Sequence, residues 1–333
     1  MKILRYLIIT ISICSVIALF FYFKNKNNNN NNKIKNIGII QIMEHECLDK
    51  SREGFIEGLK ELGFKDGENI KIDFQNAQGD QSLCNSIASN FANNYPRKDL
   101  ILAISTPAAL SAKNAIEDSP IIATCVTDFE SSGLVKSNTK PDTNVTGVSD
   151  MIPVNKQFEL IKKLMPNAKK VGILYSSNEV NSKIQAQSAS EEAKKLNIET
   201  IEYTISNSNE IAQIMNRIGK SVDAIFVPTD NTVVSCMPLV SQIASSNNLP
   251  VISSEPASVK NGALATYGID YYELGKQAAV MAVEVLNNNS YTSNIPVKFV
   301  IDNNLKLFIN KKVAEKLKID IPNELVYNAE IIN

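Results

Sequence analysis

The chain has 333 residues, of which 44% are hydrophobic and 21% charged, and its formal net charge at pH 7 is −1. This composition is typical of a globular protein and excludes a disordered or fibrous chain. The 34 basic and 35 acidic side chains balance, so no overall charge favours a nucleic acid or a strongly charged partner protein. We expect a small-molecule ligand, no nucleic-acid partner and, at about 150 residues per domain, two domains.

Residues 1–24 form a hydrophobic segment that we treat apart from the folded chain. Residues 6–23 carry no charge and follow Lys2 and Arg5. At about 1.5 Å per residue they nearly span a hydrocarbon layer of ~30 Å, with the basic end in the cytoplasm. Large aromatic residues stand where a cleavage site needs small ones, which favours a retained membrane anchor. Lipidation at Cys14 is the alternative, and in both cases the remainder is extracytoplasmic.

Residues 25–33 are almost entirely asparagine, and we expect them to form a flexible tether. From about residue 34, short β-rich runs alternate with amphipathic helical patterns, which indicates α/β architecture with parallel sheets. The expected strands are 37–42, 70–74, 100–104 and 121–126 in the first half, and 171–175, 201–205, 224–227 and 251–253 in the second. The regular spacing predicts one doubly wound architecture used twice.

The stretch 144–153 is extended and ends at a proline that opens the next helix, and we expect the chain to cross between lobes there. A strand at 263–267, a helix, and a last strand and helix within 296–317 follow. We assign residues 34–150 and about 256–290 to the first lobe, and residues 151–255 and about 291–333 to the second. Repeated crossing would join the lobes by a hinge.

The sequence lacks the residues that common catalytic sites need. His45 is the single histidine, which excludes a site of several imidazoles and a Ser-His-Asp triad. No glycine-rich phosphate cradle follows the first strand. We therefore expect no enzyme activity, catalytic residue, cofactor or metal site. Cys47, Cys84, Cys125 and Cys236 show no C-x-x-C spacing and are expected to be thiols, with a Cys47–Cys84 disulfide as the alternative.

Polar residues follow two neighbouring strands of the first lobe, where open α/β sheets bind their ligands. A hydroxyl there can cap the following helix while backbone amides stay free for an anion such as a carboxylate. In the alternative, these polar residues only cap the helix and form the turn, and they bind no anion. The residues are Ser105 and Thr106 after strand 100–104, and Cys125, Thr127 and Asp128 at the end of strand 121–126.

Polar residues also end three strands of the second lobe, namely Tyr175, Asp230 with Asn231, and Glu255. When the lobes close, Asp230 or Glu255 would face the amide donors of the first lobe, and together they would bind a zwitterion from both sides. An amino acid is such a zwitterion. Tyr175 would add apolar or stacking surface, unless it belongs to the lobe core.

Six segments of the chain resemble the TrpX-like substrate-binding proteins of ABC transporters. The resemblance runs from about Asn36 to the end and implies a type I periplasmic-binding-protein fold, with two doubly wound lobes joined by three hinge strands. It also implies capture of an aromatic amino acid, tryptophan first, for delivery to a membrane permease. A ligand-sensing receptor domain with the same fold is the alternative. The segments are 39–45, 76–80, 103–109, 144–147, 227–233 and 262–272.

The resemblance also implies roles for individual residues. In the related branched-chain amino acid binding proteins, hydroxyls and amides of the first lobe hold the ligand carboxylate and an acidic residue of the second lobe holds the ammonium. The first role falls on Ser105, the backbone of Cys125 and Thr127, and the second on Glu255, with Asp230 as the alternative. Glu44 lies in the first matching segment and joins the expected ligand-binding residues. We expect the protein to act as a monomer.

Overall fold

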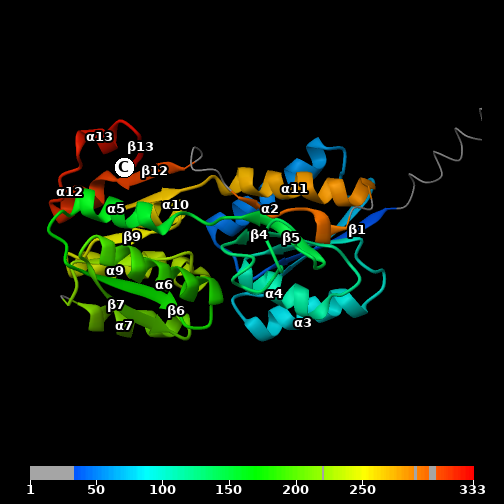
Figure 1. Ribbon diagram of the computed structural model, residues 1–333, viewed down its shortest axis with the longest axis horizontal. Helices are drawn as coiled ribbons and strands as arrows, with labels where there is room; N and C mark the ends of the chain where they lie inside the picture. Colours follow the sequence, from blue (N-terminus) through cyan, green and yellow to red (C-terminus); the bar gives the residue numbers. More distant parts are fainter. Residues whose placement is uncertain (1–33, 220, 289–290, 300–304) are drawn as a thin grey trace, which may run out of the picture.

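The computed structural model describes residues 34–219, 221–288, 291–299 and 305–333. Two sheets, each covered by helices, form two lobes that lie side by side along the longest axis (Figure 1). The expected anchor at residues 1–24, the tether at 25–33 and Cys14 lie outside the described residues. Among the helices of the described residues, none has the length and apolar character needed to cross a membrane.

The first lobe contains a six-stranded, fully parallel sheet in the order β11-β5-β4-β3-β1-β2. Helices cover both of its faces, so every residue of β3, β4 and β5 is buried. The strands are β1 (Lys35–Gln41), β2 (Ile70–Asn76), β3 (Leu100–Ile104), β4 (Ile121–Val126), β5 (Val145–Ser149) and β11 (Lys298–Phe299). The helices are α2 (Glu46–Glu61), α3 (Gln81–Asn93), α4 (Thr106–Ala115) and α11 (Tyr271–Asn288).

The second lobe contains a seven-stranded sheet in the order β13-β12-β10-β9-β8-β6-β7, in which only the β10–β12 pair is antiparallel. The strands are β6 (Lys170–Ser176), β7 (Glu199–Ile205), β8 (Ala224–Val227), β9 (Val251–Ser253), β10 (Ala265–Gly268), β12 (Lys306–Asn310) and β13 (Ala329–Ile332). The helices are α5 (Val154–Leu164), α6 (Val180–Lys195), α7 (Ile211–Ile218), α8 (Asn231–Ser235), α9 (Met237–Ser246), α10 (Pro256–Lys260), α12 (Lys311–Leu317) and α13 (Asn323–Val326).

All eight strands expected in the two halves are present, with bounds that shift by at most two residues. The cysteines within the described residues are free, and Cys47, Cys84 and Cys125 are buried. Buried thiols, rather than a Cys47–Cys84 disulfide, are therefore confirmed. Hydrophobic periodicity and strand length were sufficient to locate these elements because both sheets are buried on two faces.

The strand order differs from the expected division of the chain at two places. Strand β10 pairs in the sheet of the second lobe and β11 in the sheet of the first, whereas the expected boundaries near 256 and 291 placed them the other way round. The Thr146 hydroxyl donates a hydrogen bond to the Ile295 carbonyl at 2.7 Å, which attaches the segment before β11 to the first lobe. The alternation of strands and helices does not say which sheet a late strand joins.

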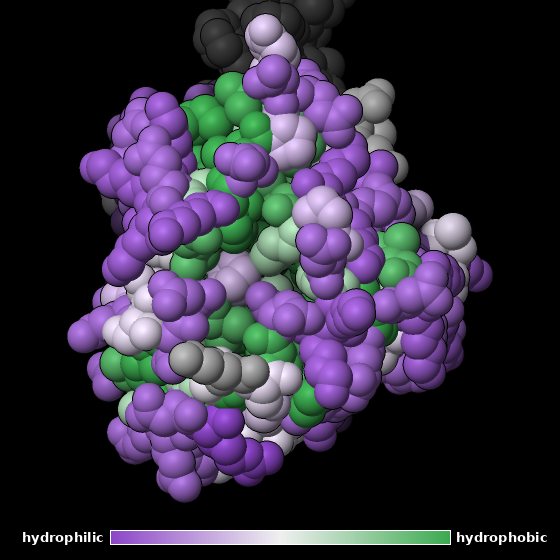
Figure 2. All heavy atoms as spheres, turned by 90° about the vertical axis from the view of Figure 1, so that its left-hand side faces the viewer, coloured by the Kyte–Doolittle hydropathy of each residue, from purple (hydrophilic) through white to green (hydrophobic). Residues whose placement is uncertain are grey.

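Helices α2 and α11 pack at backbone contact on one face of the first lobe, and small residues make this possible. A Cβ atom added to Gly275 of α11 would lie 1.9 Å from the Ser51 carbonyl oxygen of α2. At the other end of the molecule, the second lobe presents a mostly hydrophilic rim with hydrophobic side chains recessed behind it (Figure 2). Buried polar side chains gather between the lobes, at the carboxyl ends of the strands.

Candidate ligand-binding site

The two lobes meet at the carboxyl ends of their strands. The Thr127 hydroxyl, just after β4, hydrogen-bonds the Thr229 hydroxyl, just after β8, at 2.9 Å. His45 precedes α2 in the first lobe, and its Nε2 lies 3.4 Å from Asn231 Oδ1 in the second. All four side chains are largely buried by this contact. The structure is therefore that of a closed pair of lobes, with the expected residues Thr127 and Asn231 at their interface.

Three side chains at this interface carry buried polar atoms without a hydrogen-bond partner in the described part of the chain, namely His45 Nδ1, Asp150 Oδ1 and Glu255 Oε2. Asp150 follows β5 at the first crossing, and Glu255 follows β9. A buried unsatisfied polar atom costs about 1–3 kcal/mol, and more if it is charged. Such atoms mark a place where a ligand would supply the missing partners.

The interface combines several buried acidic groups with one histidine and, among the described residues, with no buried lysine or arginine. Burial, reinforced by the charge of Asp150, raises the pKa of Glu255 to about 8. Burial raises the pKa of Asp150 to about 6 and lowers that of His45 to about 4. A cationic group entering this region would stabilise the ionised carboxylates, which water no longer solvates.

The amino end of α4 provides the complementary feature in the first lobe. Ser105 caps the helix, and its hydroxyl accepts a hydrogen bond from the Ala108 amide at 3.3 Å. Thr106 is the first helical residue, and its amide has no hydrogen-bond partner within the residues that the structure describes. Ser105 and Cys125 both have positive φ, 97° and 55°, a conformation that is costly for residues other than glycine. Helix amides and dipole together favour an anion here.

Three of the expected site residues use their polar atoms elsewhere. Asp230 caps α8 and accepts hydrogen bonds from the Val233 amide at 2.7 Å and the Ser176 amide at 2.6 Å. The Tyr175 hydroxyl donates to Glu202 at 2.5 Å, and its ring packs in the core of the second lobe. Asp128 accepts from the backbone and hydroxyl of Ser131 within its own turn.

Glu44 is exposed at the edge of a groove of about 870 Å³ that runs between the lobes. The groove is lined by Glu44 and Pro107 from the first lobe and by Ser176, Glu179 and Thr232 from the second. Because Pro107 belongs to the first turn of α4, the groove reaches the amino end of that helix. It is the open side of the lobe interface.

Two acidic residues at the interface were not among the expected site residues. Asp150 follows β5, and Glu179 follows β6 and accepts hydrogen bonds from the amides and side chains of Asn231 and Thr232. Both stand just after a strand, so the rule that identified Glu255 applied to them as well. Their roles differ because Glu179 is fully hydrogen-bonded within its lobe, while one oxygen of Asp150 is not.

Comparisons with known proteins agree with this geometry. A family model described as ABC transporter substrate binding protein matches residues 36–332. A curated relative, the tyrosine-binding protein of Clostridioides difficile strain R20291, is 52% identical over 265 residues, which cover 80% of this chain and 76% of the relative. The family match includes the residues of both lobes that form the interface.

Two solved structures bear on the arrangement of the lobes. An ABC domain from Streptococcus pneumoniae in complex with L-Trp is 38% identical, with a TM-score of 0.86 over 90% of this chain and 100% of that one. A ligand-free, open substrate-binding protein with adhesive properties from Clostridium difficile is 44% identical, yet its TM-score is 0.68 over 90% of this chain and 99% of that one. The lobes are therefore arranged more like those of the complex than like those of the open structure, despite the lower identity.

Proposed function

The chain belongs to the substrate-binding proteins of ABC transporters, and we propose that it captures an aromatic amino acid between its lobes and delivers it to a membrane permease. The observation that carries the proposal is the pair of unpartnered, buried carboxylate oxygens of Asp150 and Glu255. Glu255 follows β9 on the second-lobe side of the interface, Asp150 follows β5 where the chain leaves the first lobe, and the first-lobe side also offers the amino end of α4. An acidic site opposite an amide-rich site suits a zwitterion.

In this proposal, the ligand carboxylate lies at the amino end of α4, near the hydroxyls of Ser105 and Thr106 and the backbone around Cys125. The ligand ammonium lies at Glu255, with Asp150 as a second acceptor. Asp230 does not take this role, because its two oxygens already accept backbone hydrogen bonds. Each charged group of the ligand would then form direct hydrogen bonds with a buried group of the protein. Hydrogen bonds that involve a charged partner are stronger than neutral ones.

Closure follows from contacts that a ligand makes with both lobes at once. The chain passes between the sheets after β5, after β10 and between β11 and β12, and we propose that these passages act as the hinge. A ligand that touches Ser105 in one lobe and Glu255 in the other stabilises the closed state by its differential affinity. The bond between Thr127 and Thr229 adds to the closed state only.

The aromatic character of the ligand is supported by the relatives. The relative at 52% identity is named a tyrosine-binding protein, and the neighbour at 38% identity is in complex with L-Trp. Delivery to a permease is supported by the family. We further propose that residues 1–24 tether the lobes to the outer face of the membrane from which the permease takes the ligand.

Calorimetric titration of the purified protein, after unfolding and refolding to remove any carried ligand, tests the proposal. Tyrosine or tryptophan should bind with one-to-one stoichiometry, and leucine should bind more weakly. Tyramine, which lacks the carboxylate, and 3-(4-hydroxyphenyl)propionate, which lacks the ammonium, should each bind at least about tenfold more weakly than tyrosine, because each leaves one charged site unpaired. Equal binding of tyrosine and tyramine would show that no carboxylate site exists.

A further inference from the structure

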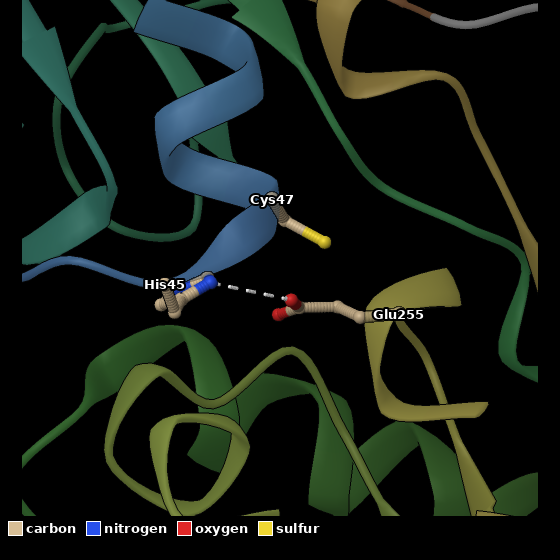
Figure 3. A group of neighbouring side chains, drawn as sticks. All are labelled: His45, Cys47 and Glu255. Atoms are coloured by element: carbon tan, nitrogen blue, oxygen red, sulfur yellow. Dashed lines mark ion pairs between the residues drawn. The ribbon is translucent and has the colours of Figure 1, made fainter. Parts of the chain in front are cut away.

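A cluster of three potential metal ligands lies at the lobe interface. One ring nitrogen of His45, Cys47 Sγ and a carboxylate oxygen of Glu255 all lie within 4.8 Å of one another (Figure 3). His45 and Cys47 come from the start of α2 in the first lobe, and Glu255 comes from the residue before α10 in the second. The three side chains point toward a common centre between the lobes.

The orientation of His45 presents an unprotonated nitrogen to this centre. Its Nε2 faces Asn231 Oδ1 at 3.4 Å, and the amide of Asn231 is held in that orientation because its Nδ2 donates to Glu179 at 2.5 Å. An amide oxygen can only accept, so Nε2 carries the proton and Nδ1 keeps its lone pair. This is the second-sphere arrangement that orients metal-binding imidazoles.

When Glu255 is ionised, the His45 nitrogen and the carboxylate face each other as two acceptors. His45 Nδ1 lies 3.9 Å from Glu255 Oε2, and the side chains are only 7% and 5% exposed. Neither atom has a hydrogen-bond partner within the described residues. Two buried lone-pair donors at this separation repel each other unless a proton or another cation lies between them.

The donor set selects among cations. One imidazole nitrogen, one sulfur and one carboxylate oxygen suit zinc, whereas magnesium and calcium prefer oxygen ligands alone. Ligand atoms around a tetrahedral zinc lie roughly 3.3–3.8 Å apart, given bond lengths of about 2.0–2.3 Å. The ligand atoms of the cluster, which lie within 4.8 Å of one another, therefore need to approach by at most about 1–1.5 Å to reach these separations.

We propose that the protein binds one zinc ion between its lobes through His45 Nδ1, Cys47 Sγ and the Glu255 carboxylate. The Cys47 thiol releases its proton to solvent as the thiolate binds, and the fourth position is left to water. A zinc ion that joins ligands of both lobes favours the closed state. The zinc ion also occupies the Glu255 carboxylate that we assign to the ligand ammonium, so zinc competes with the amino acid. This competition rests on the proposed function, whereas the zinc site does not.

Cobalt(II) is the probe for the site, because a thiolate bound to it produces an intense near-ultraviolet charge-transfer band. Titration of the reduced, full-length protein should give this band with one cobalt per chain, and zinc should abolish it. Cys47→Ala should remove the band and weaken zinc binding at least about 100-fold, since it deletes a direct ligand. Cys84→Ala, a buried thiol of the same lobe outside the cluster, should leave both unchanged.

Cys47→Ser covers the case in which the alanine variant does not fold, because it keeps nearly the same volume and should also lose the band. Absence of a thiolate band in the wild-type protein, or a band that persists in both Cys47 variants, would overturn the site. Tyrosine titration separates the two proposals. Zinc should weaken tyrosine binding to the wild-type protein and not to Cys47→Ala.

If tyrosine binds and cobalt gives no thiolate band, the zinc site is wrong and the proposed function stands. If the band appears and tyrosine, tryptophan and phenylalanine all fail to bind, the zinc site stands and the proposed function is wrong. If both bind without competing, Glu255 serves only one of them, and the shared-carboxylate assignment is wrong.

Discussion

Replacing Glu255 by glutamine should weaken binding of the amino acid in a way that depends on pH. The substitution keeps the size of the side chain and one acceptor oxygen but removes the negative charge. We take the charged hydrogen bond between Glu255 and the ligand ammonium to be worth about 3 kcal/mol more than a neutral one in this buried place. If the carboxylate were always ionised, the loss would be on the order of 100-fold in Kd.

The carboxylate is not always ionised, because burial raises the pKa of Glu255 to about 8. Binding the ammonium requires the ionised form, and at pH 6.5 ionisation costs about 2 kcal/mol, at 1.36 kcal/mol per pH unit. The net loss in the glutamine variant is then about 1 kcal/mol, or roughly fivefold in Kd. At pH 8.5 the ionisation cost nearly vanishes, and the loss should approach 100-fold.

Calorimetric titration with tyrosine at pH 6.5, 7.5 and 8.5, in buffers of different ionisation enthalpy, measures both the affinity and the protons released. The wild-type protein should release close to one proton per ligand at pH 6.5, and Glu255→Gln should release markedly less. Asp230→Asn is the matched control, because the Asp230 carboxylate accepts hydrogen bonds from backbone amides. This variant should have a lower free energy of unfolding and nearly the same Kd as the wild type. Equal Kd values for Glu255→Gln and the wild type at pH 8.5 would refute the assignment of the ammonium site.

Three further expectations concern stability and closure. In the closed state the pKa of Glu255 is higher than in the unfolded chain, so the closed state binds more protons. The contribution of Glu255 to the stability of the closed, ligand-free protein should therefore fall by about 2 kcal/mol between pH 6.5 and 8. A melting temperature that rises over this range, measured by calorimetry, would contradict this expectation. Thr229→Val removes the hydrogen bond to Thr127 between the lobes. The loss of about 1 kcal/mol should weaken tyrosine binding about fivefold, while the free energy of unfolding by urea stays nearly unchanged. Unchanged affinity would show that the bond does not contribute to closure. Gly275→Ala places a methyl group against the Ser51 carbonyl oxygen. It should lower the free energy of unfolding by at least about 2 kcal/mol, while the folded fraction still binds ligand. A urea midpoint equal to that of the wild type would contradict this packing.

The fold could be predicted from the sequence because its strands are short, buried runs separated by helical patterns, as in Leu100–Ile104 and Ala224–Val227. The sheet that each of the late strands joins could not be predicted in the same way. Strand β11 has two residues, and its membership of the first lobe depends on contacts with β5 that periodicity does not encode. Local pattern thus determines the elements, and long-range pairing determines the lobe.

The site could be predicted only at the level of strand ends. Ser105, Thr127 and Glu255 were identified because each follows a buried strand, and the structure places all three among the buried residues at those strand ends. Asp230 satisfies the same rule, yet α8 begins directly after it and uses its carboxylate as a cap. Whether a carboxylate stays available therefore depends on which amides lie beside it, and that is settled by tertiary packing rather than by sequence position.

In our proposal, an aromatic amino acid occupies the closed interface between the two lobes. Mass spectrometry of the small molecules released when the freshly purified, full-length protein is denatured shows which solute the lobes hold. We predict that tyrosine, tryptophan or phenylalanine is released in a nearly equimolar amount, and that Glu255→Gln carries much less of it. Release of a different solute, or release of none together with no binding of these amino acids after refolding, would contradict the claim.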